Sequence, residues 1–190
     1  MSPRTAKQNK QIREQKELQI LSAALQMFSE NGFGNTSMQS VSKAAGVSKG
    51  NLYNYFESKE ALLERIIQNG LEKIMLHYTG IGSIENEAEF EKILRASFEM
   101  LRENQAFWKL FYNLVTQPKV QQLFHKIFYA FFESYMSLYV TYYQNKGEKN
   151  PEAVALLLGA GIDGISLAFS MMGDLYPLDD VVGELIEKFK

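Results

Sequence analysis

The chain of 190 residues contains no cysteine and only two histidines, and these absences exclude several chemistries. Without cysteine there can be no disulfide bond and no thiolate metal site. The two histidines, His77 and His125, form no nucleophile-and-base set and no metal-ligand spacing with other residues. We therefore expect no enzyme activity, no bound metal and no cofactor.

The sequence also lacks an apolar stretch near its beginning and any clear strand pattern. Its first residues are polar and basic, which is unlike a signal peptide, so we expect residence in the cytoplasm. Hydrophobic residues make up 46% of the chain, as in a globular protein. Their spacing is helical, as in the stripe Leu18, Leu21, Leu25 and Phe28. The expected fold is all-α, with about nine helices.

The segment from Thr36 to Lys59 predicts two short helices joined by a fixed turn. Thr36, with Gln39 three residues on, fits a capping box that starts a helix. Gly46 supplies the left-handed conformation that ends it, and Ser48 is a suitable cap for the next helix. A connection of roughly four residues is the length that a helix-turn-helix uses.

The second of these helices is predicted to have one apolar and one polar side. Leu52 and Phe56 lie one turn apart and should face the core, which turns Gly50 and Asn54 outward. Free amides in a first turn favour a phosphate, asparagine can pair with adenine, and lysine and tyrosine can donate to bases or phosphates. An ordinary helical hairpin with a solvated face is the alternative. The candidate DNA-binding residues are Thr36, Ser37, Gln39, Ser48, Lys49, Gly50, Asn51, Tyr53, Asn54, Tyr55 and Lys59.

The wider segment 20–67 resembles the DNA-binding domain of the TetR family of transcriptional regulators. The resemblance is carried by Phe28, by Asn31, Gly32 and Phe33, by the stretch VSKGNLYNYF, and by the SKEAL opening of a following helix. It implies a homodimeric repressor with a three-helix helix-turn-helix head, followed by a helical region for ligand binding and dimerisation. The rest of the chain fits the family in length and helical pattern only.

Charge is distributed unevenly, although the net charge is only −2. Residues 1–59 hold eight lysines and arginines against four acids, whereas the remainder holds 12 against 18. A basic beginning and an acidic remainder favour one orientation on DNA. The first basic residues form either a helical extension or a flexible arm. An arm would add phosphate or minor-groove contacts to DNA, and the alternative is a solvated terminus that makes no such contacts. They are Arg4, Lys7, Lys10, Arg13 and Lys16.

The remaining sequence predicts further helices separated by loops. One helix starts at the cap residue Ser58 and continues to about His77, and two glycines indicate a loop over 79–83. Two domains are expected, a DNA-binding domain with a basic arm in residues 1–62 and a helical ligand-binding and dimerisation domain in residues 63–190. The later helices are predicted over about 86–103, 105–116, 119–145, from Asn150 and Pro151 to near Gly173, and 178–189.

Aromatic residues are concentrated in segments 107–112 and 124–143. Their spacing of three and four residues is typical of any buried helix, so core packing is the default interpretation. The longer segment nevertheless carries aromatics on more than one side, and buried tyrosines need hydroxyl partners, which suits a pocket for a bulky apolar or aromatic ligand. The candidate ligand-binding residues are Phe111, Tyr112, His125, Phe128, Phe132 and Tyr135.

The stretch from Ala153 to Gly173 is long and apolar enough to span a bilayer. Asp163 near its middle would cost roughly 2.5–3.5 kcal/mol there, and aromatic and basic belts are lacking, so we expect no membrane partner. The better interpretation is a helix buried on nearly all sides, which a chain this small achieves through a second copy. With the final helix it is predicted to form an isologous homodimer interface. The predicted interface residues are Gly159, Ala160, Gly161, Gly164, Val181, Val182, Leu185, Ile186 and Phe189.

The function expected from these patterns is a sequence-specific transcriptional regulator. Two symmetry-related heads suit a palindromic double-stranded DNA operator, and a small-molecule effector would release a homodimeric repressor from it. The alternative is a ligand-independent DNA-binding protein of weak specificity, which only measured specificity distinguishes. A scaffold module that does not bind DNA is disfavoured by the basic beginning and the VSKGNLYNYF stretch.

Overall fold

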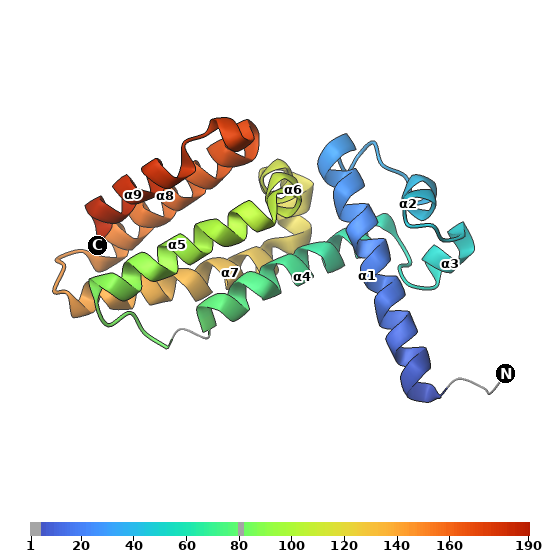
Figure 1. Ribbon diagram of the computed structural model, residues 1–190, viewed down its shortest axis with the longest axis horizontal. Coiled ribbons are helices and arrows are strands. Elements are labelled where there is room, and N and C mark those ends of the chain that lie inside the picture. The colour runs from blue at the N-terminus through green and yellow to red at the C-terminus, as the bar shows by residue number, and fades with distance from the viewer. Residues whose placement is uncertain (1–4, 80–81) are drawn as a thin grey trace. The chain divides into compact units, whose positions relative to one another are not determined.

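The chain folds into helices throughout the part that the structure describes. A computed structural model describes residues 5–79 and 82–190, and among these it has nine α-helices and no strand (Figure 1). The all-α prediction is confirmed. The helices are α1 (Ala6–Asn31), α2 (Met38–Ala44), α3 (Lys49–Tyr53), α4 (Lys59–Thr79), α5 (Glu87–Glu103), α6 (Gln105–Val115), α7 (Pro118–Asn145), α8 (Pro151–Met172) and α9 (Leu178–Phe189), with a 3-10 turn, η1 (Gly173–Leu175), after α8.

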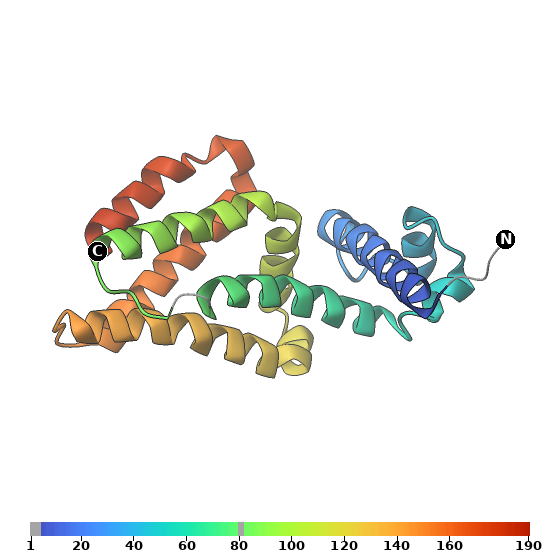
Figure 2. The same cartoon turned by 60° about the horizontal axis from the view of Figure 1, so that its bottom comes forward.

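The helices form two compact units, Met1–Asn69 and Gly70–Lys190. The division expected from the sequence lay after residue 62. No loop marks the boundary, because α4 is one uninterrupted helix that begins in the first unit and ends in the second. In the second unit α8 packs against α6, α7 and α9, while α9 also packs against α5. Figures 1 and 2 show α6 running across the direction of α5 and α7.

The first unit buries apolar side chains from all three of its opening helices. Ile20 and Phe28 of α1, Val41 of α2 and Leu52 of α3 have almost no exposed surface. Leu18, which was expected in the apolar stripe of α1, is instead 62% exposed. The reason is that α1 is exposed over most of its length before Ile20, so its buried face begins later than the apolar pattern suggests.

The start of α2 differs from the prediction. The predicted capping box at Thr36 and Gln39 is wrong, because Ser37 is the cap. Its hydroxyl accepts a hydrogen bond from the Ser40 backbone amide, and the Ser40 hydroxyl accepts one from the Ser37 backbone amide. Thr36 is only 3% exposed, and its hydroxyl donates to the carbonyl of Gly32 at 2.9 Å. Two adjacent hydroxyl residues both fit the cap pattern, and tertiary burial of the first leaves the second as the cap.

The turn between α2 and α3 is as predicted. Gly46 has a φ of +61°, the left-handed conformation that favours glycine. The Ser48 hydroxyl accepts a hydrogen bond from the Asn51 amide at 3.1 Å and so caps α3. α3 is short, since its last residue is Tyr53, but the backbone hydrogen bond from Phe56 to Leu52 continues the turn.

The helices of the second unit begin and end close to their predicted positions. The Asn86 side chain caps α5 by accepting a backbone hydrogen bond. α7 starts at Pro118 and α8 at Pro151, because proline fits a first turn, where no N–H partner is needed. The Asn150 side chain makes no capping hydrogen bond. The loop expected at 79–83 includes residues 80 and 81, which lie outside the described residues.

Two glycines let helices of the second unit approach closely. A Cβ at Gly70 of α4 would lie 2.0 Å from the Phe107 ring of α6, and a Cβ at Gly161 of α8 would lie 2.8 Å from Leu185 of α9. The contact at Gly70 depends on the missing side chain, because a Cβ there would overlap the ring, whereas at Gly161 the end of the Leu185 side chain would have to shift. Gly161 was expected at a dimer interface, but it serves packing within one protomer.

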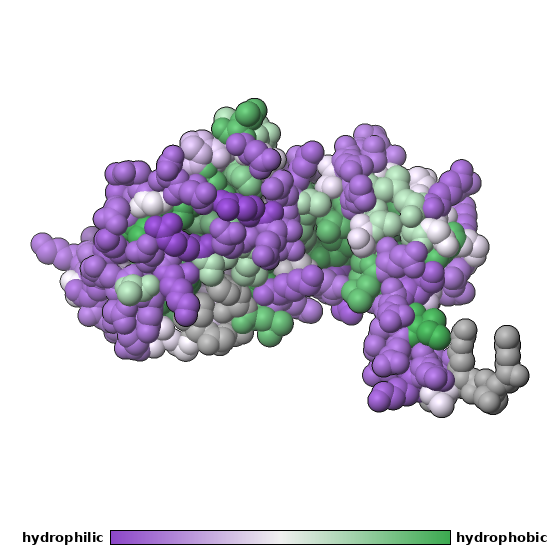
Figure 3. Space-filling model, in the orientation of Figure 1, coloured by the Kyte–Doolittle hydropathy of each residue, from purple (hydrophilic) through white to green (hydrophobic). Residues whose placement is uncertain are grey.

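The two sides of α8 and α9 are used differently from the prediction. Several residues expected at a dimer interface are buried inside the protomer, namely Gly159, Val182, Leu185 and Ile186. In contrast, α8 exposes an apolar face that includes Leu157, Leu167 and Met171, which are 64%, 43% and 79% exposed. Figure 3 shows an apolar patch over the turn between α8 and α9.

α8 is also the one helix, within the described ranges, that is long and apolar enough to cross a membrane. This rests on length and composition alone, and core helices of soluble proteins meet the same criterion. A single such helix is therefore weak evidence for a membrane span.

Candidate nucleic-acid interface and ligand cavity

α3 presents a polar and unobstructed face to solvent. Lys49, Gly50 and Asn54 are exposed, whereas Leu52 and Phe56 are buried. A Cβ at Gly50 would meet no atom of the described residues within 4 Å, so this stretch of backbone is locally open. The face therefore combines an amine, an amide and open backbone, which are groups that contact DNA bases and phosphates.

Other candidate DNA-binding residues surround this face in sequence. Ser37, Gln39 and Ser48 are exposed, although both serines also cap helices. Tyr53 is 45% exposed, and its hydroxyl is available as a donor or acceptor. Asn51 is half-buried, and its backbone amide is bonded to Ser48.

The basic segment at the beginning of the chain is helical where it is described. Thr5 and Gln8 form a capping box that starts α1, so the helical extension is the alternative found from residue 6 onward. The guanidinium of Arg13 lies 5.6 Å from the centre of the half-buried Tyr55 ring, a cation–π contact that engages both residues. Arg4 lies outside the described residues. The exposed basic residues on this part of α1 are Lys7, Lys10 and Arg13.

Two of the candidates hold the first unit together instead of facing solvent. The Lys59 amine donates to the Phe33 carbonyl at 2.7 Å and to the Thr36 carbonyl at 3.0 Å. It also lies 4.4 Å from the centre of the Phe33 ring. Thr36 is buried and Lys59 is half-buried, so both side chains are engaged within the first unit. These partners lie 23 and 26 residues from Lys59, and no local sequence pattern could have indicated them.

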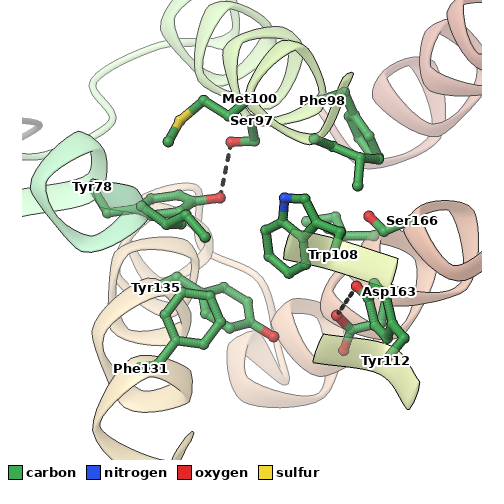
Figure 4. A pocket seen from close by; sticks show the side chains of 13 residues that line it. Tyr78, Ser97, Phe98, Met100, Trp108, Tyr112, Phe131, Tyr135, Asp163 and Ser166 are labelled. Atoms are coloured by element: carbon green, nitrogen blue, oxygen red, sulfur yellow. Dashed lines mark hydrogen bonds between the residues drawn. The ribbon is translucent and has the colours of Figure 1, made fainter. Parts of the chain in front are cut away.

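The second unit contains a narrow cavity between its helices. Its volume is about 40 Å³. Ligand pockets typically have roughly 300–1,000 Å³, so a bulky ligand has to widen this cavity. Figure 4 shows its lining side chains, ten of which are labelled. The described lining is Ile74, Tyr78, Ser97, Phe98, Met100, Leu101, Trp108, Tyr112, Phe131, Tyr135, Ile162, Asp163 and Ser166.

The polar groups of the cavity are few and mostly phenolic. The Tyr78 and Ser97 hydroxyls share a hydrogen bond of 2.9 Å, and the Tyr112 hydroxyl donates to Asp163 Oδ1 at 3.4 Å. Burial raises the pKa of the Asp163 carboxyl above its usual range, and the hydrogen bond from Tyr112 opposes this shift. Burial, with the nearby charge of Asp163, also raises the pKa of the Tyr112 and Tyr135 phenols.

Only part of the predicted ligand-binding set lies at this cavity. Tyr112 and Tyr135 line it. Phe111 and Phe128 pack edge to face with ring centres 5.4 Å apart, so they form its surroundings. His125 and Phe132 are exposed on α7 and do not line it. The density of aromatics on α6 and α7 identified the region, but it does not indicate which sides of α7 are buried.

The lining residues that come from α4, α5 and α8 were not among the predicted ligand-binding residues. Trp108 was noted as an aromatic residue but was not selected, and Tyr78, Ser97 and Asp163 come from helices without a dense aromatic pattern. Among the residues that the structure describes, no group of three or more histidines, cysteines or acids could hold a metal ion.

Known proteins that are similar to this chain are bacterial transcriptional regulators with a helix-turn-helix. The family described as "Bacterial regulatory proteins, tetR family" matches residues 20–66. Over 59 residues the chain is 44% identical to the HTH-type transcriptional regulator UidR of Escherichia coli (strain K12), which covers 31% of this chain and 30% of UidR. The matched stretches span 30% to 53% of the curated regulators to which the chain is similar.

Solved structures extend the likeness of fold over most of the chain. SmeT, the repressor of the Stenotrophomonas maltophilia multidrug efflux pump SmeDEF, aligns with a TM-score of 0.72 at 19% identity, covering 91% of this chain and 87% of SmeT. FadR of Bacillus subtilis, solved in complex with stearoyl-CoA, aligns with a TM-score of 0.75 at 18% identity, covering 90% and 96%. The resemblance noted in the sequence is confirmed over residues 20–66, which match the family described as bacterial regulatory proteins of the tetR family.

Proposed function

We propose that the protein is a sequence-specific DNA-binding transcriptional regulator, a homodimeric repressor that a small apolar or aromatic ligand releases from a palindromic operator. The observation that carries this proposal is the open polar face of α3 on a head that matches the TetR family. The regulators to which the chain is similar in sequence support it, as does the repressor SmeT in fold. Such a protein acts in the cytoplasm.

Within the head, α3 is the element that enters the major groove. Asn54 and Lys49 are the residues we propose for base and phosphate contacts, and the open backbone at Gly50 lets the duplex come close. Tyr53 contributes a hydroxyl from the same helix. Thr36 and Lys59 are excluded because their side chains are already bonded within the head. The further contacts proposed are Ser37, Gln39, Ser48, Asn51 and Tyr55.

A second copy of the chain is proposed to cover the exposed face of α8. Leu157, Leu167 and Met171 give this helix an apolar surface that a monomer would leave in water. A two-fold pairing of this face would relate two heads by the same axis, and operator half-sites would then lie about 34–36 Å apart or a multiple of that. Leu157→Glu should convert the dimer to a monomer in sedimentation. A wild-type monomer at micromolar concentration would rule the dimer out.

The cavity is proposed as the effector site, because it is the described pocket with a mostly aromatic and aliphatic wall. α4 contributes Ile74 and Tyr78 to its wall, and the same uninterrupted helix begins at Lys59 in the first unit. A ligand that widens the cavity can therefore bias the position of α4. The loss of operator affinity can be as large as the ratio of the ligand's affinities for the widened and unwidened conformations.

The test is fluorescence anisotropy with labelled duplex from the region upstream of the gene and with a scrambled duplex, across a salt series. We expect a preference of roughly a thousandfold for the first duplex. Lys49→Ala and Asn54→Ala should abolish this preference, whereas Lys188→Ala, at an exposed position of α9, is the matched control. Equal and steeply salt-dependent binding to both duplexes would favour the alternative, a weakly specific and ligand-independent DNA-binding protein.

A further inference from the structure

The cavity of the second unit combines an aromatic wall with a single charged group. Trp108, Tyr112, Phe131 and Tyr135 supply rings, and Asp163 is the one charged residue in the described lining. No lysine, arginine or histidine is among those lining residues. Figure 4 shows Asp163 and Tyr112 at one side of the cavity, Tyr78 at the other, and Trp108 between them.

The protein does not neutralise this carboxylate within its described residues. Asp163 forms no ion pair there, and the hydrogen bond it accepts from the Tyr112 hydroxyl is long, at 3.4 Å. Tyr112 and Tyr135 are near enough to sense the charge of Asp163. Asp163 keeps part of its surface in solvent, which lowers the cost of leaving it without a counter-charge, but a cation bound in the cavity would still be attracted to it.

Aromatic faces add a second attraction for the same kind of ligand. The face of an aromatic ring carries partial negative charge and attracts a cation, most strongly when the ring belongs to tryptophan. Quaternary and protonated amines are therefore favoured by both the rings and the carboxylate. We propose that the effector of this protein is an apolar cation, an ammonium group on an aliphatic or aromatic body, whose charge lies beside Asp163. This inference rests on the proposed function, in which the cavity receives the effector.

The indole of Trp108 indicates one more feature of the ligand. Trp108 is only 9% exposed, and its Nε1 has no hydrogen-bond partner in the described part of the chain. Figure 4 shows this nitrogen on the side of the ring toward Tyr78 and Ser97. A buried donor without an acceptor is costly, so a ligand that brings an acceptor atom to Trp108 gains affinity.

Anionic ligands are disfavoured by the same arrangement. The phosphates of an acyl-CoA, such as the stearoyl-CoA bound to FadR of Bacillus subtilis, would meet Asp163 without a basic residue in the described lining to balance them. Like charges at close range repel most strongly where water is excluded. The two proteins share a fold at 18% identity, and that similarity does not extend to ligand class.

The experiment compares three probes of similar shape and different charge. Benzyltrimethylammonium is the cation, neopentylbenzene is its neutral carbon isostere, and phenylmethanesulfonate is an anion of similar size. Trp108 is the one tryptophan of the sequence, so its fluorescence reports occupancy of the cavity directly. The proteins are the wild type, Asp163→Asn, Asp163→Glu and the matched control Asp180→Asn, which changes an exposed aspartate on α9 in the same way.

We expect Asp163→Asn to weaken benzyltrimethylammonium binding by about tenfold, because the side chain is partly open to solvent and water screens part of the attraction. Neopentylbenzene affinity should change by less than about twofold, since it carries no charge. Asp163→Glu retains the charge and should keep the preference for the cation, which shows that any loss in Asp163→Asn is electrostatic. Asp180→Asn should match the wild type.

The inference is overturned if Asp163→Asn leaves cation affinity unchanged, or if the wild type binds the sulfonate as tightly as the cation. A parallel titration on preformed protein–DNA complex separates this outcome from the proposed function. Release of the duplex by the cation in the wild type and not in Asp163→Asn supports both. Cation binding without any effect on DNA supports the ligand class and refutes the proposed role of the cavity as the effector site.

Discussion

Replacing Gly50 by alanine separates the stability of the head from its contact with DNA. In the free protein the new methyl group meets no atom within 4 Å, so it causes no clash. Glycine in a helix is less favourable than alanine by about 0.5–1 kcal/mol, because its backbone loses more freedom on folding. Gly50→Ala should therefore raise the melting temperature by about 1–4 °C.

The same methyl group should weaken DNA binding. If the α3 backbone approaches the duplex at van der Waals distance, the added carbon must displace a DNA atom or tilt the helix. Overpacking of a well-fitted contact typically costs about 1–3 kcal/mol. The expected loss of operator affinity is thus about fivefold to 150-fold.

Both effects are measured on one preparation, by thermal unfolding and by anisotropy with operator DNA. Gly183→Ala is the control, since it too adds a methyl group in open space on a helix, but on α9 in the other unit. It should leave operator affinity unchanged. Full operator affinity in a stabilised Gly50→Ala protein would refute the close approach of α3 to DNA, and a destabilised protein would refute the open surface at Gly50.

Three further substitutions test other parts of the account. Gly70→Ala should destabilise the second unit by about 1–3 kcal/mol in urea unfolding, because its Cβ would overlap the Phe107 ring. Adding Phe107→Leu should recover part of this loss. If the double variant is no more stable than Gly70→Ala, the overlap is not the cause. Lys59→Met removes a donor to the Phe33, Gly34 and Thr36 carbonyls and should cost about 1–3 kcal/mol in denaturant unfolding, whereas an unchanged midpoint would show that the amine is dispensable. The folded state raises the pKa of Asp163, so the free energy of unfolding of the wild type should fall as pH rises from the usual aspartate pKa through the raised value. Asp163→Asn should therefore be more stable than the wild type at neutral pH and should lose that advantage on acidification. An advantage that is constant with pH would contradict this assignment.

Local patterns predicted most of the secondary structure, because caps and turns depend on neighbouring residues. Gly46 and Ser48 mark the turn between α2 and α3, and prolines mark the starts of α7 and α8. The prediction failed where tertiary contacts decide between equivalent choices. Thr36 and Ser37 are equally good caps by sequence, and burial of Thr36 against the loop after α1 selects Ser37.

The candidate sites were predictable to different extents for the same reason. The outward face of α3 follows from helical spacing once Leu52 and Phe56 are assigned to the core. The cavity gathers side chains from five helices, so spacing within one helix could identify Tyr112 and Tyr135 but not Asp163, which lies on α8. The contacts of Lys59 within the first unit could not be predicted, because its partners lie more than 20 residues away.

The most direct test of the central claim is selection of bound DNA from a random duplex library with the purified, full-length protein. Sequence-specific binding by a two-fold dimer predicts enrichment of an inverted repeat whose half-sites are separated by about one helical turn, 34–36 Å, or a multiple of it. Asn54→Ala should bind this sequence with reduced preference. A library that shows no enrichment after selection, although the protein remains folded and dimeric, would contradict the account.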